Sequence, residues 1–141
     1  MQNRPKVIAF LIGSPGDLIN LVAISSVFSY PKIGGKPAYL SKILSMQSER
    51  EVRGRDGITV TNCVPHSEYM GPIDTLVIVG GESVFTEPSS DVIRWIHRRA
   101  GHARRIVSVC VGAFVLSDRI TGWKTRDHPL APRCQTRPAI P

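Results

Sequence analysis

Three continuous apolar runs, each followed within two residues by glycine, constrain the fold of this chain most strongly. They are Val7–Ile12, Asp74–Val79 and Ile106–Cys110. Such runs are typical of strands that are buried on both faces of a parallel sheet. Because helix-type patterns follow them, the sequence predicts an α/β fold: a three-layer sandwich around a mainly parallel sheet, flavodoxin-like in type.

Helical spacing follows each apolar run. After the first run, apolar residues repeat at i, i+3 and i+4 and predict one buried helix face (Leu18, Leu21, Val22, Ile24, Val27 and Phe28). Ser89–Asp91 caps a second helix, whose apolar stripe around Trp95 ends before Gly101. A third helix is expected to begin directly after the third run, over Val111–Leu116.

Shorter elements are expected between the first helix and the second run. Pro31–Pro37 contains two central glycines and predicts a loop. Tyr39–Leu44 and Ile58–Thr61 are predicted strands, the second half-exposed near a sheet edge. The charged segment Glu49–Asp56 is expected to form the turn between them.

Length and composition exclude several classes of protein. The chain has 141 residues, enough for one domain, and its 42% hydrophobic and 21% charged residues exclude a disordered chain. The longest uncharged stretch, Leu18–Pro31, has 14 residues, whereas a membrane span needs about 18. Three cysteines, an odd number, argue against a disulfide scaffold and favour the reducing cytoplasm. We therefore expect a cytoplasmic protein without a membrane partner.

The sequence carries no pattern for a cofactor or a metal. Gly80 and Gly81 lack the further spacing of a dinucleotide-binding loop. Cys63 and His66 lack a second pair of ligands, so a zinc site is not expected. We accordingly predict neither a cofactor nor a metal.

Positive charge is concentrated in the last third of the chain. The formal net charge is +7, and residues 94–141 hold 10 basic and 2 acidic residues. Such a segment can attract nucleic acid. The alternative, which we favour, is that these cations complement the C-terminal dipole of the second helix, since no aromatic residues are interleaved with them. Without a helix-turn-helix, the chain alone is expected to show no sequence-specific DNA binding.

The most specific local motif is Ser108–Gly112, in which a strand ends at a cysteine and a helix begins at once. A tight strand–turn–helix connection of this kind lifts a nucleophile above a sheet, so Cys110 is a candidate nucleophile. Backbone N–H groups near Val111 and Gly81 are candidates for an oxyanion hole. The alternative is that Cys110 is a small buried hydrophobic residue at a strand end, a common fate of a lone cysteine.

The segments Asp74–Gly81 and Ser108–Leu116 resemble the DJ-1/PfpI superfamily, which has a class I glutamine amidotransferase-like fold. The pattern is similar to the N-terminal domain of AraC-type transcriptional regulators and, next, to isonitrile hydratase-like members. The resemblance implies a domain over residues 1–128, a homodimer, and a nucleophile at Cys110. It also implies an oxyanion or ligand-binding role for the residues at Gly80, Gly81, Val111 and Gly112.

Two positions depart from the family pattern. The acidic position in the first βα region falls on Asn20, seven residues before Val27, while Asp17 is out of register. The family histidine falls on His128, a candidate base; the alternative is a surface residue. The proline-rich, irregular tail 129–141 follows it where the family continues with further strands and helices. The resemblance therefore implies a domain that is incomplete at its C-terminal side.

Three functions remain open from the sequence. The first is a small-molecule-sensing domain of an AraC-type regulator that lacks its DNA-binding part. The second is a stand-alone Cys-dependent enzyme of the superfamily: an isonitrile hydratase-like enzyme, a glyoxalase-like lyase or a hydrolase, with Cys110 as nucleophile. The third is a redox sensor that acts through oxidation of Cys110.

Overall fold

Five parallel strands form the main sheet of the structure, a computed structural model that describes residues 4–84 and 88–119. Their order is β7-β4-β1-β8-β9, and each neighbouring pair is parallel. The strands are β1 (Lys6–Ile12), β4 (Tyr39–Ser45), β7 (Val64–Pro65), β8 (Thr75–Val79) and β9 (Arg105–Val109). The predicted α/β fold with a parallel sheet is confirmed.

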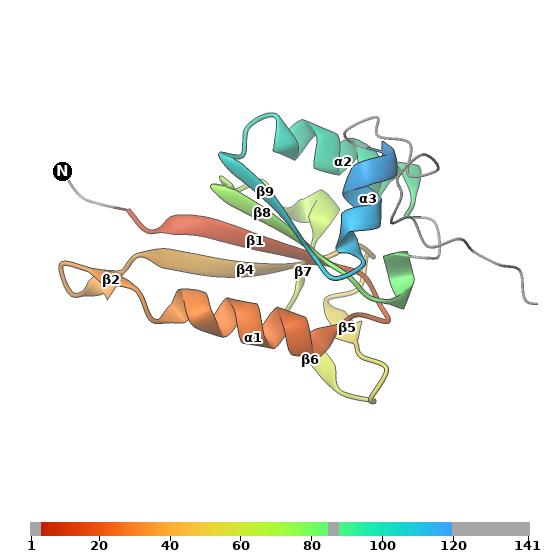
Figure 1. The fold of residues 1–141 in the computed structure, drawn as a ribbon, viewed down its shortest axis with the longest axis horizontal. Helices are drawn as coiled ribbons and strands as arrows, with labels where there is room; N and C mark the ends of the chain where they lie inside the picture. Colours follow the sequence, from red (N-terminus) through yellow and green to blue (C-terminus); the bar gives the residue numbers. More distant parts are fainter. Residues whose placement is uncertain (1–3, 85–87, 120–141) are drawn as a thin grey trace, which may run out of the picture.

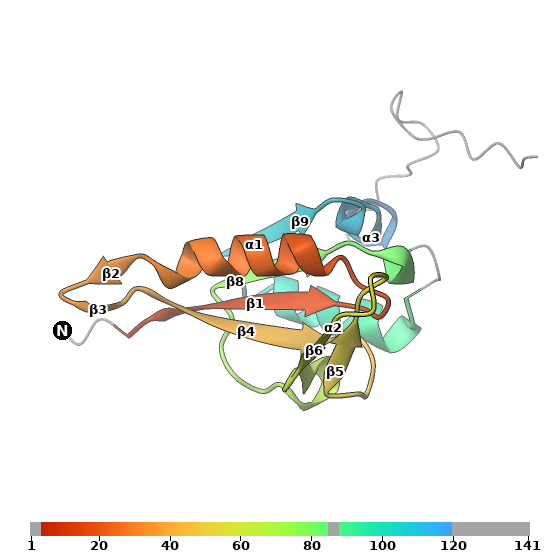
Figure 2. The same cartoon turned by 90° about the horizontal axis from the view of Figure 1, so that it is seen from below.

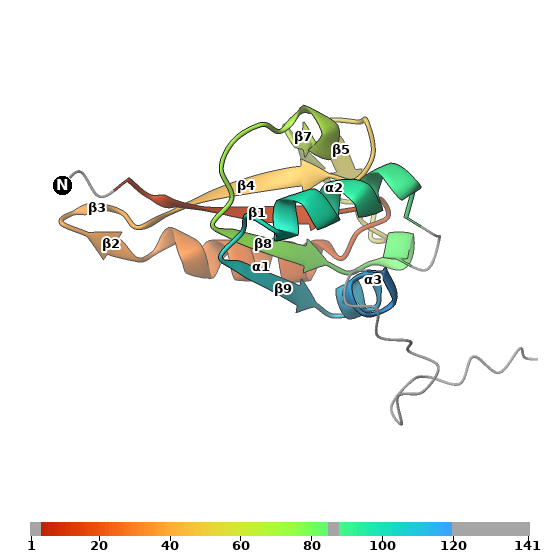
Figure 3. The same ribbon diagram turned by 90° about the horizontal axis from the view of Figure 1, so that it is seen from above.

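Helices cover both faces of this sheet. Helix α1 (Leu18–Ser29) lies across one face, and α2 (Ser90–Ala100) with α3 (Gly112–Arg119) covers the other (Figure 1). Figure 2 shows α1 over the centre of the sheet, and Figure 3 shows α2 crossing the strands on the opposite side. The three layers predicted from the sequence are therefore present.

Strand β1 contributes to both hydrophobic cores. Ile8, Phe10 and Ile12 are buried in the core beneath α1. Ala9 and Leu11 are buried on the other face, in the core that includes the α2 side chains. Because successive side chains of a strand point to opposite faces, a continuous apolar run serves both layers at once.

Two small hairpins and two 3-10 turns lie outside the main sheet. Strands β2 (Lys32–Ile33) and β3 (Lys36–Pro37) pair as a hairpin within the segment that was predicted to be a loop. Strands β5 (Glu51–Arg53) and β6 (Thr59–Thr61) form the second hairpin. The 3-10 turns are η1 (His66–Glu68) and η2 (Glu82–Val84).

The second hairpin corrects two predictions. The charged segment expected to be a turn contains strand β5, and its partner β6 pairs with β5 instead of lying near an edge of the main sheet. The physical reason is that Val52 is fully buried beneath the α1 side of the sheet, so one apolar residue anchors an otherwise charged strand. The alternating pattern of Ile58–Thr61 correctly predicted a strand, but the strand with which it pairs was not predicted.

Helix α1 is less buried than its sequence predicts. Leu18 and Leu21 are buried, whereas Val22 and Val27 are 54% and 64% exposed. The helix is apolar on all sides, so sequence spacing alone could not identify which stripe contacts the sheet. The prediction that Val22 and Val27 belong to the buried face is wrong.

The other two helices agree with their sequence signals. The Ser89 side chain accepts a hydrogen bond from the Val92 N–H at 3.4 Å and caps α2, and Val92, Trp95 and Ile96 are buried. Helix α3 begins where it was expected and buries Val115. None of the helices in the described segments is long and apolar enough to cross a membrane. The tail 129–141 lies outside the described residues.

Strand β9 is more exposed than the predicted buried strand. Ile106 and Val107 are 36% and 39% exposed, because within the described segments β9 pairs only with β8. The amino ends of β8 and β9 are joined at Asp74. The Asp74 carbonyl accepts hydrogen bonds from the N–H groups of Arg104 and Arg105 at 2.9 and 3.2 Å. The Asp74 carboxylate also accepts two bonds from the Arg104 guanidinium at 2.9 and 2.8 Å.

This bidentate pair predicts an acid-sensitive contribution to stability. Hydrogen bonds from Arg104, together with one from Thr75 and the charge of Lys6, hold the pKa of Asp74 at about 2, below its ordinary value. The folded state thus binds fewer protons at Asp74 than the unfolded state between about pH 4 and pH 2. The resulting stabilisation is complete above this window and is lost as the pH falls through it.

We therefore expect Asp74→Asn to lower the melting temperature at pH 7, and this difference from the parent to shrink below about pH 4 and vanish near pH 2. Thermal unfolding of both proteins across this pH range measures the effect. Asp91→Asn is the control, since Asp91 is an exposed carboxylate in the first turn of α2. A difference between Asp74→Asn and the parent that does not change with pH would contradict this assignment.

Candidate functional site

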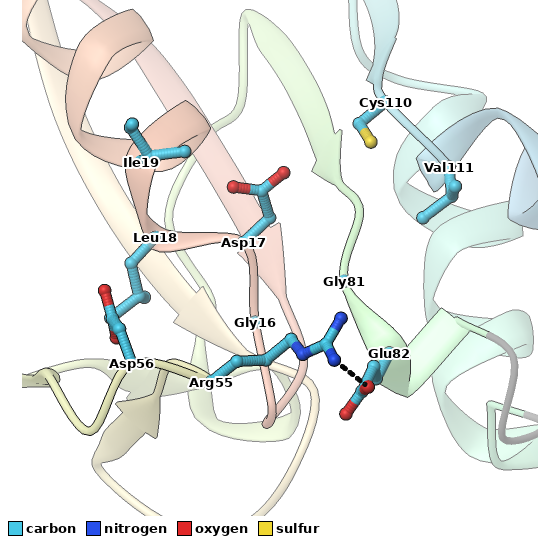
Figure 4. A pocket seen from close by; sticks show the side chains of 10 residues that line it. All are labelled: Gly16, Asp17, Leu18, Ile19, Arg55, Asp56, Gly81, Glu82, Cys110 and Val111. Carbon is cyan, nitrogen blue, oxygen red and sulfur yellow. Dashed lines mark ion pairs between the residues drawn. The ribbon is translucent and has the colours of Figure 1, made fainter.

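A cleft lies at the carboxyl ends of β1, β8 and β9. In open α/β sheets, ligands bind where the connections from neighbouring strands diverge to opposite faces. Here the chain leaves β1 towards α1 and leaves β8 towards α2, on opposite faces (Figure 1). The cleft has a volume of about 320 Å³ and is lined by Gly16, Asp17, Leu18, Ile19, Arg55, Asp56, Gly81, Glu82, Cys110 and Val111 (Figure 4).

Cys110 occupies a sharp turn between β9 and α3. Its φ angle is +55°, a left-handed conformation that costs a non-glycine residue about 1–3 kcal/mol. The residue is exposed, and its sulfur projects from the end of the strand beside the cleft (Figure 4). The alternative of a buried structural cysteine is therefore wrong. Strand β9, the turn and helix α3 follow one another as the sequence predicts, while the nucleophile elbow and the nucleophilic role of Cys110 stay predictions.

Asp17 stands on the α1 side of the same cleft (Figure 4). It is the N-cap of α1, and its carboxylate accepts a hydrogen bond from the Asn20 N–H at 3.3 Å. Its own N–H donates to the Gly80 carbonyl at 3.1 Å, which joins the β1–α1 connection to the end of β8. Asp17, which the family resemblance left out of register, is thus one of the acidic residues that share a cleft with Cys110, and it is the one at the N-terminus of α1.

Asn20, the predicted occupant of the acidic position, does not line the cleft. Its side-chain amide donates a 2.5 Å hydrogen bond to the Asp17 carboxylate. An amide cannot supply or take a proton as a carboxyl does. In this structure Asn20 instead holds Asp17, so the carboxylate that this segment contributes to the cleft comes from a residue three positions earlier.

Glycines permit the close approach of the three connections. A Cβ atom on Gly112 would lie 2.4 Å from the Ile78 carbonyl oxygen, and one on Gly80 would lie 2.8 Å from the Val111 side chain. The Gly80 N–H also donates to the Val109 carbonyl at 3.1 Å. Gly80 and Gly112 are thus packed behind the cleft lining, and a direct ligand contact by either stays a prediction.

Gly81 and Val111, two of the residues with a predicted ligand-binding role, line the cleft. A Cβ atom on Gly81 would lie 2.8 Å from the Pro15 carbonyl oxygen, so this position also needs glycine to meet the β1–α1 connection. The two residues flank the Cys110 turn from β8 and from the start of α3. Their part in an oxyanion hole stays a prediction.

An ion pair links two sides of the cleft. The Arg55 guanidinium, from the turn of the β5–β6 hairpin, lies 3.2 Å from a Glu82 carboxylate oxygen in η2 (Figure 4). Asp17 and Asp56 contribute two more carboxylates, so the ionisable side chains carry three negative charges and one positive charge. This formal balance of −2 favours neutral or cationic ligands over anionic ones.

The remaining predicted positions lie elsewhere. His128 and Cys134 fall outside the described residues. Cys63 and His66 are both buried, and His66 Nδ1 lies 3.2 Å from the Ser45 carbonyl oxygen. The described residues contain no group of three or more His, Cys, Asp or Glu side chains that could hold a metal ion.

Solved proteins share this arrangement of strands and helices. A ThiJ/PfpI family protein from Pseudomonas syringae has a TM-score of 0.67 at 18% identity, over 81% of this chain and 46% of that one. An AraC family transcriptional regulator from Pseudomonas putida has a TM-score of 0.63 at 16% identity, over 81% and 70% of the two chains. DJ-1 superfamily proteins are also among these structures. The chain has the DJ-1/PfpI fold.

A sequence relative links this fold to regulators. The HTH-type transcriptional regulator Rv1931c from Mycobacterium tuberculosis is 35% identical over 71 residues, which is 49% of this chain and 27% of that protein. The chain thus spans about a quarter of the regulator's length and about half of the length of the Pseudomonas syringae protein. No family model matches the chain.

Several residues that line this cleft were not predicted from the sequence. Asp17 carried a usable signal, because an aspartate directly before a helix that follows a buried strand is an N-cap at the ligand-binding edge. Arg55 and Asp56 carried none, since the hairpin that brings them to the cleft was not expected. Ile19 was assigned to no particular face of its helix.

We expect Gly112→Ala to destabilise the fold by about 2 kcal/mol or more, because the new methyl group meets a buried backbone carbonyl. Gly101→Ala is the matched control. Gly101 has right-handed backbone angles, and a Cβ atom there would meet nothing nearer than 3.8 Å. Urea unfolding of both variants measures the difference, and equal effects would contradict the close packing of this turn.

We expect the two described cysteines to differ in reactivity. Cys63 is buried, and desolvation raises the pKa of its thiol, although a hydrogen bond from the Val52 backbone opposes this. In a Cys134→Ser background, iodoacetamide should modify Cys110 in the native protein and Cys63 only after unfolding. Mass spectrometry of peptides identifies the site, with Cys110→Ser as control. Equal modification of both thiols in the native state would contradict the prediction.

Proposed function

We propose that this chain is the small-molecule-binding domain of an AraC-type regulator, with its ligand held in the cleft between Asp17 and Cys110. The observation that carries the proposal is the position of the cleft, at the point of a DJ-1/PfpI sheet where connections diverge to opposite faces. Its volume of about 320 Å³ lies within the range of small-molecule sites. The proposal includes a cytoplasmic location and a homodimer.

The regulator assignment rests on the sequence relative. The 35% identity extends over 71 residues of an HTH-type regulator, whereas the fold alone is shared with DJ-1 superfamily proteins. In this reading the chain supplies the ligand-binding part, and no sequence-specific DNA binding is assigned to it. A ligand would alter transcription by binding one conformation of the regulator more tightly than another.

The charge of the cleft narrows the ligand class. Three carboxylates face one guanidinium, which is already paired with Glu82. The apolar side chains of Leu18, Ile19 and Val111 line the same space. We infer that the ligand is a small neutral or amine-bearing molecule, since a carboxylic acid would enter against this negative field.

A binding test follows from the position of Ile19. It lines the cleft and is exposed, so Ile19→Trp should fill the cleft without disturbing a core. Val22→Trp, on the same helix and also exposed, is the matched control because Val22 does not line the cleft. Thermal unfolding is measured with a panel of small primary amines, amino alcohols and neutral amides, and with carboxylic acids of the same size.

We expect at least one amine or amide to raise the melting temperature of the parent and of Val22→Trp, but not of Ile19→Trp. Carboxylic acids should give the weaker response. If no compound stabilises the parent, or if Ile19→Trp responds as fully as the parent, the cleft is not the ligand site and the proposal fails.

A stand-alone Cys-dependent enzyme is the second candidate function. The strained turn at Cys110 and the Asp17 carboxylate in the same cleft favour it. In such an enzyme, Cys110 would attack an electrophilic carbon, Asp17 would transfer the proton, and the N–H groups of Gly81 and Val111 would bind the developing oxyanion.

This candidate predicts that Cys110→Ser and Asp17→Asn each lower turnover of methylglyoxal, an isonitrile or a simple amide by about 100-fold or more. Turnover is followed by loss of substrate, with Cys63→Ser as the control thiol variant. Rates for Cys110→Ser equal to those of the parent would exclude the enzyme and leave the binding domain.

A further inference from the structure

The ion pairs of the described segments are distributed unevenly between the two ends of the sheet. Three arginines on or near the β5–β6 hairpin, beside the carboxyl ends of the strands, are each paired: Arg50 with Glu68, Arg53 with Glu51, and Arg55 with Glu82. The amino ends of the strands and the β2–β3 hairpin instead carry six cations: Arg4, Lys6, Lys32, Lys36, Arg104 and Arg105. Within the described residues, only Arg104 among these six has a carboxylate partner.

A small cleft lies within this basic end, between the start of β1 and the β2–β3 hairpin. Its volume is about 80 Å³, and it is lined by Arg4, Pro5, Lys6, Ile33, Pro37, Ala38 and Tyr39. Two backbone hydrogen bonds hold its walls: the Lys6 N–H donates to the Ala38 carbonyl at 3.0 Å, and the Ala38 N–H donates to the Pro31 carbonyl at 2.9 Å. The lining therefore has two cations, and no carboxylate among the described residues.

The acidic group that acts on this region, Asp74, already has a cationic partner. Asp74 acts on the same region, since the charge of Lys6 contributes to lowering its pKa. Both oxygens of its carboxylate are already bonded by the Arg104 guanidinium, at 2.9 and 2.8 Å. Among the described residues, the lining itself thus holds no carboxylate that competes with an anion for Arg4 and Lys6, and the charge of Asp74, which acts on Lys6, is balanced by Arg104.

We propose that this cleft binds the phosphate group of an anionic ligand, with the Arg4 guanidinium and the Lys6 ammonium as the binding cations. The cleft, with a volume of about 80 Å³, suits a single phosphate group. The arginine guanidinium can donate two parallel hydrogen bonds to a phosphate, and the lysine ammonium adds a compact positive charge. Phosphate groups are commonly bound by both kinds of donor. The rest of the ligand would lie outside, over the exposed Lys32 and Lys36 of the hairpin.

This site is independent of the proposed function. It lies at the opposite end of the strands from Cys110, with the hairpin and the start of β1 on one side of Figure 1 and the Cys110 turn on the other. The phosphate group has two possible sources, a free phosphate ester and a nucleic-acid backbone. Both sources present the same phosphate oxygens to Arg4 and Lys6. The experiment therefore uses one probe for each source.

The experiment uses the full chain and two double variants of equal charge. Arg4→Gln with Lys6→Gln removes two exposed cations from the cleft. Arg53→Gln with Arg94→Gln removes two exposed cations from elsewhere and is the matched control. Binding of inorganic phosphate is measured by calorimetry, and binding of a short random-sequence DNA duplex by fluorescence anisotropy at about 50 and about 200 mM salt.

We expect phosphate to bind the parent and the control variant, and to bind the cleft variant roughly fivefold or more weakly. If the affinity for the DNA duplex falls by the same factor in the cleft variant, and the salt dependence of that affinity is weaker in this variant only, the source is a nucleic-acid backbone. If phosphate alone shows it, the source is a free phosphate ester. Equal weakening in both variants, or no binding of either probe by the parent, would overturn the proposal. Melting temperatures without ligand confirm that the variants are folded.

Discussion

Strand β1 is the element on which the rest of the structure depends. It is hydrogen-bonded in parallel to β4 on one side and to β8 on the other, over most of its length. The side chains from Ile8 to Ile12 are buried in two separate cores, one beneath α1 and one beneath α2. A polar residue anywhere in this run would be buried without a partner, which explains why the run is apolar throughout.

The end of β1 also determines where chemistry can occur. The chain must leave the sheet there towards α1, while β8 releases its chain towards α2 on the other face. Three connections approach so closely that a side chain at Gly81 or Gly112 would meet a backbone carbonyl. The same crowding that requires glycine brings Asp17 and Cys110 to one cleft, although they are 93 positions apart in the sequence.

The sequence was sufficient for β1, β4, β8 and β9, for the second helix and for the Cys110 turn, but not for the two-residue edge strand β7. These features depend on local patterns: uninterrupted apolar runs, a serine cap before Val92, and a cysteine placed between a strand and a helix. The burial of α1 and the pairing of β5 with β6 were not predictable in this way. Both depend on a tertiary contact, such as the burial of Val52, that leaves no periodic signal in a short charged segment.

Asp17 was not chosen as the acidic residue of the first βα region for a related reason. Counting from Val27 led to Asn20, because a family position was carried over by sequence register alone. Helix α1 begins at Leu18, so Asp17 is its N-cap, and its carboxylate is held at the cleft by the Asn20 amide. A capping argument applied to Ser14–Asp17 would have favoured Asp17, since the capping side chain lies beside the strand end where ligands bind.

The opposite charges at the two ends of the sheet have two different origins. Helices α1 and α2 begin at the cleft end of the sheet. Asp17 and Asp91 complement the dipoles at these N-termini, and Arg98 complements the dipole at the C-terminus of α2. This accounts for much of the acidic end. It does not account for the five cations that lie outside the helices: Lys6 and Arg105 on strands, Lys32 and Lys36 on the β2–β3 hairpin, and Arg4 just before β1. Because helix capping leaves these cations unexplained, and because no described carboxylate pairs with them, an external anion is the simplest partner for the basic end.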